Sequence, residues 1–214
     1  MSILNIHLEK DLAVIAANTE VVAGELGSDV IALRSNVGKV FALPEKGAVV
    51  SGRGWSALLC DLLTWAANSS TDFDGLCESM GDAAAAIVRR AFAHAGAAGA
   101  TAENMAHFLR GELVLVGRSA SRQTMICNYL AVSERGEISA HCELASAVIP
   151  WVWGDHPATE GSVEWMTNMA RRQSKLAHSD QPGMAWRGDL TIATITPESI
   201  DLRTVRDFWM EPKS

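Results

Sequence analysis

Cysteine is scarce in this 214-residue chain, and its four copies show no metal-binding spacing. Cys60, Cys77, Cys127 and Cys142 form neither a CxxC pair nor a pattern with paired histidines. Structural zinc sites use such spacings, so we predict no metal site. We interpret the four residues as buried thiols in a reducing compartment.

Long apolar runs are also missing. No stretch reaches the roughly 18 apolar residues that a membrane-spanning helix requires. The N-terminus lacks a basic flank followed by an apolar segment and a small-residue cleavage site, which secretory signals show. We therefore expect no membrane association and a cytoplasmic location.

Positive charge is in deficit, with 18 Lys and Arg against 25 Asp and Glu and a net charge of −7. Phosphate binding needs a concentrated Lys/Arg surface, so nucleic acid is not expected as a partner. The closest basic pairs, Arg89-Arg90 and Arg171-Arg172, lie on predicted helices, and we interpret them as solvated faces.

Repeats, low-complexity tracts and linkers are absent as well, which predicts one domain over residues 1–214. A hydrophobic content of 48% at this length supports a substantial core. None of the six histidines has a partner at i+4 or a clear Ser/Asp constellation, so a histidine-based triad is not predicted.

The chain opens with two short apolar runs, residues 3–8 and 12–17, which predict a β-hairpin around the polar triplet Glu9-Lys10-Asp11. With Leu8 opposite Leu12, Ser2 faces Asn18 at the open end, with Cβ atoms roughly 5 Å apart. If Met1 is removed, Ser2 carries a hydroxyl nucleophile and an α-amine that can act as its general base. The alternative is that these polar residues simply mark two strand ends.

Hydrophobic periodicity predicts the remaining elements. Further strands are expected at residues 30–33, 39–43, 48–51, 112–116, 124–133, 137–144 and 190–196. Helices are expected at residues 55–66, 82–95 and 159–176, with a long loop between the first two and a short C-terminal helix from Pro197.

This order of elements predicts an α+β fold, a four-layer α-β-β-α sandwich of two antiparallel sheets. The run from Leu12 to Ala17 is apolar at every position instead of alternating. That pattern is typical of a central strand covered on both faces.

Six segments together form a pattern that extends over nearly the whole chain: Ser2-Ile3-Leu4, residues 10–18, Lys39-Val40-Phe41, Gly52-Arg53-Gly54, residues 146–154 and residues 188–196. These segments resemble proteasome β-type subunits and related bacterial peptidase subunits. Members of that family are N-terminal nucleophile (Ntn) hydrolases with this sandwich fold.

The resemblance implies roles for individual residues. Ser2 matches the N-terminal threonine nucleophile, Lys39 the lysine that tunes the nucleophile's amine, and Asn18 the aspartate that orients this lysine. The backbone N–H groups around Gly52 and Gly54 match the oxyanion-stabilising region, a contribution commonly worth about 10²-fold or more in rate. Ser146 matches the serine of a glycine-serine-glycine loop with a one-residue shift.

The departures from the family pattern lie around the same site. Asn18 in place of aspartate removes a carboxylate, so Lys39 is expected to lack its nearest countercharge. The longer spacing between Ser2 and Lys39 implies an inserted loop near residues 23–28. The family's aspartate and serine before the last strand have no clean counterpart.

The resemblance implies a serine amidohydrolase or peptidase that cleaves peptide or other amide bonds without a metal or organic cofactor. It also implies assembly into a homo-oligomeric ring. Residues 42–50, mainly small and aliphatic, are expected to give an apolar preference next to the cleaved bond. The alternative is a non-catalytic proteasome-fold structural or assembly protein with a degraded active site.

Overall fold

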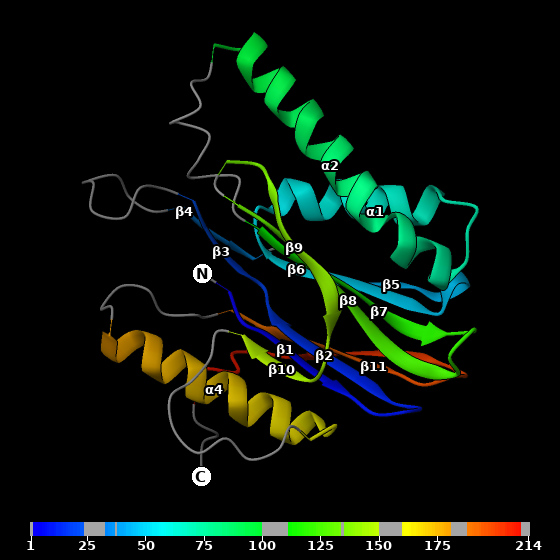
Figure 1. Cartoon of the computed structure of the whole chain (residues 1–214). Helices are drawn as coiled ribbons and strands as arrows, with labels where there is room; N and C mark the ends of the chain where they lie inside the picture. The colour runs from blue at the N-terminus through cyan, green and yellow to red at the C-terminus, as the bar shows by residue number, and fades with distance from the viewer. Residues whose placement is uncertain are drawn as a thin grey trace.

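The structure is a computed structural model that describes residues 2–23, 33–36, 38–99, 111–133, 135–149, 160–180 and 188–210. Within these residues it contains two five-stranded antiparallel sheets, a two-stranded ribbon and three α-helices (Figure 1). The α+β class and the two antiparallel sheets predicted from the sequence are confirmed. The expected loop at residues 24–28 lies outside the described residues.

The first sheet has the strand order β10-β1-β2-β11-β12. Its central strand is buried at all six positions, as its unbroken apolar run predicts. The five strands are β1 (Leu4–Leu8), β2 (Ala13–Asn18), β10 (Ala147–Ile149), β11 (Leu190–Ile195) and β12 (Ile200–Val205).

The predicted C-terminal helix is wrong, because the chain turns back as strand β12. The Thr196 hydroxyl accepts hydrogen bonds from the backbone N–H groups of Glu198 and Ser199, which closes a tight turn. β12 then pairs antiparallel with β11, from Ile195 opposite Ile200 to Leu190 opposite Val205. A serine or threonine hydroxyl that binds nearby backbone favours such a turn over helix.

The hairpin β1–β2 has a register one residue different from the predicted one. Leu8 lies opposite Ala13, and the Glu9 N–H donates to the Leu12 carbonyl at 2.7 Å. The connection is therefore the two-residue turn Lys10-Asp11, the length whose twist best suits a hairpin. Continuing this register places Asn18 opposite Ile3 instead of Ser2.

The second sheet has the order β5-β6-β7-β8-β9. Its strands are β5 (Val40–Leu43), β6 (Ala48–Gly54), β7 (Gly111–Ser119), β8 (Thr124–Val132) and β9 (Ile138–Leu144), with the 3₁₀ turn η1 (Pro44–Lys46) between the first two. The separate ribbon pairs β3 (Glu20–Ala23) with β4 (Leu33–Asn36). Residues 30–32 of a predicted strand lie outside the described residues.

Two helices, α1 (Ser56–Asn68) and α2 (Phe73–Ala97), cover the outer face of the second sheet. α2 begins at Phe73, so the prediction of a long loop and a start near Asp82 is wrong. The Asp72 carboxylate accepts the Gly75 N–H at 3.0 Å and caps the helix there. The third helix, α4 (Val163–Asp180), covers the outer face of the first sheet.

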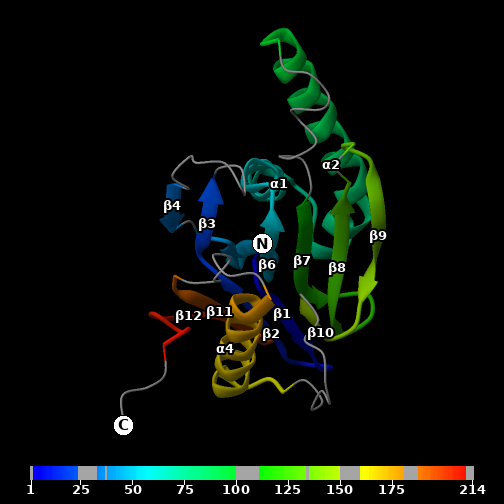
Figure 2. The same cartoon turned by 90° about the vertical axis from the view of Figure 1, so that its left-hand side faces the viewer.

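Three apolar clusters correspond to the three contacts between layers. One joins α1 and α2 to the second sheet, one lies between the sheets, and one joins α4 to the first sheet. Figure 2 shows α4 and α1 on opposite sides of the paired sheets. None of the helices in the described residues is long and apolar enough to cross a membrane.

Candidate active site

The site centres on the Ser2 hydroxyl and the Lys39 amine. Lys39 Nζ donates a hydrogen bond to Ser2 Oγ at 2.8 Å and another to the Glu20 carbonyl at 2.6 Å. The Ser2 and Lys39 residues are only 7% and 5% exposed. The fold thus brings a hydroxyl and an amine together in a largely water-excluded position.

The ends of two strands hold these residues. Ser2 precedes β1, and the adjacent Ile3 N–H donates to Asn18 Oδ1 at 2.8 Å, which ties the start of the chain to the end of β2. Lys39 precedes β5, where Val40 pairs with Ser51 on β6. Continuing that register brings Lys39 next to Gly52.

Burial lowers the pKa of Lys39 from 10.5 to about 8, because the charged amine is poorly solvated, and the negative charge of Glu20 opposes this effect. The expectation that Lys39 lacks a countercharge is therefore wrong. Glu20 is itself buried and supplies that charge. The sequence carries a signal for this residue, because side chains at i and i+2 of an extended chain, here Asn18 and Glu20, lie on the same face.

Gly52 and Gly54 line a small pocket beside Lys39. Its volume of about 10 Å³ holds roughly one water-sized group. A Cβ atom on Gly52 would lie 2.7 Å from the Glu112 carbonyl, and Gly54 has φ +88°. Both positions therefore require glycine on structural grounds, independent of any chemistry.

The walls of this pocket come from the end of β6 and the start of α1, including Trp55, Leu59 and Cys60. The prediction that residues 42–50 contact substrate is wrong for the end of that range. Val49 and Val50 are fully buried, in the inter-sheet cluster and in the cluster under α1 and α2.

Ser146 lies away from this group. Its hydroxyl accepts the Leu8 N–H at 2.8 Å, at the end of β1 opposite to Ser2. Leu4 and Leu8 alone are about 13 Å apart along an extended strand. The structure therefore does not place Ser146 beside Ser2, contrary to the match inferred from sequence. Residues 150–154 of the compared segment lie outside the described residues.

In the part of the chain that the structure describes, the cysteines and histidines form no second reactive centre. Cys127 is buried, but Cys60 and Cys142 are exposed and Cys77 is partly exposed, so the prediction of four buried thiols is wrong for these three. Burial raises the pKa of Cys77 to about 12, which keeps that thiol protonated. His7 lies 3.0 Å from a Glu9 carboxylate oxygen and is buried as a structural residue. Among the residues that the structure describes, no group of three or more His, Cys, Asp or Glu side chains could hold a metal ion.

No protein-family model matches the chain, and no curated protein matches its sequence significantly. The chemistry of the site therefore follows from its own residues and their geometry.

Proposed function

We propose that the protein is an amidohydrolase of the N-terminal nucleophile type, which cleaves peptide or other amide bonds after Met1 is removed. The observation that carries this proposal is the 2.8 Å contact between the buried Lys39 amine and the Ser2 hydroxyl. A buried lysine is costly to fold, so its contact with a hydroxyl at the chain start is better explained by chemistry than by stability.

The reaction would begin with attack of Ser2 Oγ on the carbonyl carbon of the substrate. The hydroxyl proton passes to the α-amine of Ser2, which then delivers it to the departing amine as the C–N bond breaks. This leaves an ester on Ser2 and releases the amine product. Water, deprotonated by the same α-amine, hydrolyses the ester and restores the hydroxyl.

Lys39 would keep this α-amine unprotonated. A second cation close by lowers the pKa of an amine, whose ordinary value is about 8, so that its neutral form dominates near neutral pH. Because the pKa of Lys39 is itself about 8, the two amines titrate as a coupled pair. The Glu20 carboxylate opposes part of the fall in the pKa of Lys39, because it stabilises the charged form of this amine.

Gly52 and Gly54 line the pocket next to Lys39, which is where the substrate carbonyl would lie. We assign the stabilisation of the oxyanion to the backbone of this segment. A side chain at Gly52 would collide with the neighbouring strand, and Gly54 adopts a positive φ that favours glycine.

The layer order supports the proteasome-like form of the proposal. Helices lie outside two antiparallel sheets, and the nucleophile and lysine, which precede strands of the two different sheets, contact each other. On this proposal the protein assembles into a homo-oligomeric ring in the cytoplasm and needs no cofactor.

A second candidate function is a non-catalytic structural or assembly protein of the same fold. Asn18 favours it, because this side chain binds the Ile3 N–H and adds no carboxylate to the site.

Hydrolysis of short fluorogenic peptidyl amides separates the two functions. We expect the wild type to release the fluorophore, Ser2→Ala to be inactive, and Ser2→Cys to retain measurable turnover, because a thiol can replace the hydroxyl as nucleophile. Ser70→Ala, in the exposed loop after α1, serves as a matched control with full activity expected. Equal rates for wild type and Ser2→Ala would eliminate the catalytic proposal.

A further inference from the structure

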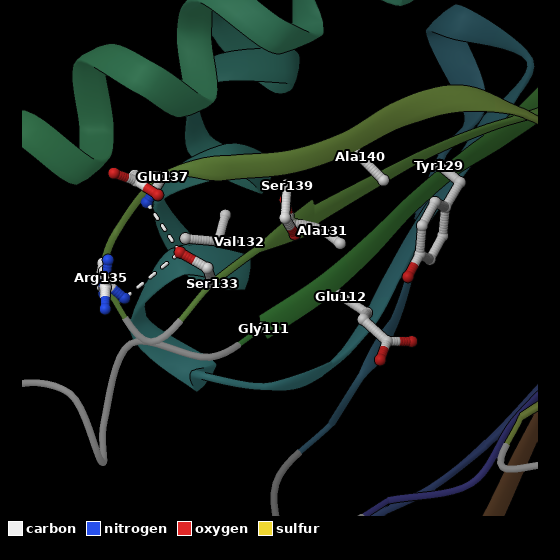
Figure 3. A pocket seen from close by; sticks show the side chains of 10 residues that line it. All are labelled: Gly111, Glu112, Tyr129, Ala131, Val132, Ser133, Arg135, Glu137, Ser139 and Ala140. Atoms are coloured by element: carbon white, nitrogen blue, oxygen red, sulfur yellow. Dashed lines mark hydrogen bonds between the residues drawn. The ribbon is translucent and has the colours of Figure 1, made fainter.

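The large cavity in Figure 3 lies on the second sheet and takes no part in the chemistry above. Its volume of about 640 Å³ falls in the range of ligand-binding pockets. The lining residues come from β7, β8, β9 and the turn before β9, and they include Glu112, Tyr129, Ala131, Arg135, Glu137 and Ala140.

The strand register places this cavity at the same end of the sheet as the candidate active site. Gly52 on β6, beside Lys39, is followed by Arg53, which pairs with Glu112 on β7. Arg53 lines the small pocket and Glu112 lines the large cavity. Neighbouring strands lie about 4.8 Å apart, so β7 is roughly 10 Å from β5, and the cavity continues to β9.

Small side chains hollow out this face. Glu112 lies opposite Ala131, and Ala131 lies opposite Ala140, so one row across three strands carries two alanines. The Tyr129 ring projects from β8 beside them (Figure 3). The middle of this surface therefore carries two methyl groups beside one aromatic ring, and the hydroxyl groups of Ser133 and Ser139 also line the cavity.

The charged side chains at the cavity occur as pairs of opposite sign. The Arg53 guanidinium binds both Glu112 oxygens, at 2.9 Å and 2.5 Å, and the two side chains are 17% and 15% exposed. Such a bidentate pair leaves little net charge to attract an ion. Burial and the Glu112 charge raise the pKa of Tyr129 to about 12, so its hydroxyl stays neutral. Arg135 and Glu137 contribute opposite charges at the far end.

We propose that this cavity binds a bulky, uncharged side chain of an extended peptide, about three or four residues from the bond that Ser2 attacks. This inference rests on the proposed function. The spacing follows from the roughly 10–15 Å between the strands of Lys39 and the cavity, at about 3.3 Å per extended residue. The natural substrate is then a polypeptide, because a small amide cannot span both places.

Binding to the inactive Ser2→Ala variant tests the cavity without any need for turnover. The probes are fluorescent ten-residue peptides of Ala, Gly and Ser, with a single Phe moved through successive positions. One position of Phe is expected to tighten binding about tenfold or more in fluorescence anisotropy, which is the effect of burying an aromatic side chain. Replacing this Phe by Lys is expected to remove the gain.

Filling the cavity tests where the Phe binds. Ala131→Leu, added to Ser2→Ala, is expected to abolish the tenfold gain, and so is Ala140→Leu on the edge strand β9. Ala93→Leu on the exposed face of α2 is the matched control and is expected to keep it. Binding that is independent of Phe position, or unchanged in both filled variants, would overturn the proposal.

Turnover distinguishes this proposal from the function on which it rests. With Ser2 intact, Ala131→Leu is expected to lower kcat/KM about tenfold for the best ten-residue peptide and to leave short peptidyl amides unaffected. If neither substrate is cleaved, the proposed hydrolase function is rejected. The binding experiment with Ser2→Ala then still tests whether the cavity binds the peptide. If both are cleaved and Ala131→Leu affects them equally, the cavity proposal fails alone.

Discussion

Lys39 is a buried amine held between a hydroxyl and a backbone carbonyl, and its charge lowers the stability of the fold. Its pKa falls from 10.5 in the unfolded chain to about 8 in the folded one. Between about pH 8 and pH 10.5, Lys39 is protonated in the unfolded chain and mostly deprotonated in the native state. The free energy of unfolding therefore rises with pH across this window, and the charge is most destabilising below pH 8.

Lys39→Met is thus expected to stabilise the protein at pH 7 while it abolishes hydrolysis. The shift of about 2.5 units corresponds to a stabilisation on the order of 3 kcal/mol. Urea unfolding at pH 7 and pH 10 measures this effect, and the wild-type rise between these pH values should shrink in the variant. Lys10→Met, in the exposed hairpin turn, is the control. A Lys39→Met protein less stable than wild type at pH 7 would contradict this interpretation.

Glu20 is expected to set the pH range of activity. The carboxylate favours the protonated forms of Lys39 and of the coupled Ser2 α-amine, so Glu20→Gln should lower the apparent pKa of this pair and shift the acid limb of the kcat/KM profile to lower pH. Glu45→Gln, in the exposed turn η1, should leave the profile unchanged. A shift to higher pH in Glu20→Gln would refute the role of this charge.

The residue-level predictions from sequence depended on a register that differs by one position. Ser2 and Lys39 stand out from sequence as polar residues at predicted strand ends. Glu20 did not, because the comparison drew attention to Asn18, the position where a carboxylate was expected. The carboxylate lies two residues further along, on the same face of the extended chain as Asn18.

At the scale of elements, the end of β6 depends on glycine. Gly54 has φ +88°, so Gly54→Ala is expected to cost about 1–2 kcal/mol of stability and to reduce activity by displacing the pocket wall. Gly96→Ala near the end of α2 is the matched control. A Cβ there meets nothing within 4 Å, so it should stabilise by about 0.5–1 kcal/mol. Thermal unfolding of the two variants decides between these outcomes, and equal shifts in Tm would contradict the account.

A buried amide pair fixes α4 against β1. Asn5 Nδ2 donates to Gln173 Oε1 at 2.8 Å, and Gln173 Nε2 donates to Asn5 Oδ1 at 3.1 Å, with both residues fully buried. Asn5→Leu is expected to cost about 1–3 kcal/mol in urea unfolding, because Gln173 loses this partner. Adding Gln173→Leu should recover most of the loss. A double variant as unstable as the sum of the single ones would show that the pair is not coupled.

Elements with strong periodicity were predictable, and those set by local capping were not. The positions of β2, α1, β7 and β8 follow from apolar patterns. The start of α2 at Phe73 depends on the Asp72 cap, and β12 depends on the turn at Thr196. Ile200–Val205 is a six-residue, largely exposed edge strand with three apolar residues, so its pattern alone did not separate it from a short helix.

At the scale of the whole molecule, the sequence predicted two antiparallel sheets but not how distant segments meet. The pairing of Leu4 with Ile149 and the contact of Asn5 with Gln173 join parts of the chain far apart in sequence. Such pairs depend on the packing of complete layers, which local patterns do not encode. The large cavity is likewise a product of strand register, because Ala131 and Ala140 meet only across β8 and β9.

Intact mass spectrometry of the purified protein, before and after reaction with a β-lactone, tests the central claim most directly. The account predicts a chain that lacks Met1 and gains one covalent adduct, located on Ser2 by peptide mapping and absent from Ser2→Ala. A chain that keeps Met1 and gains no adduct would contradict the account.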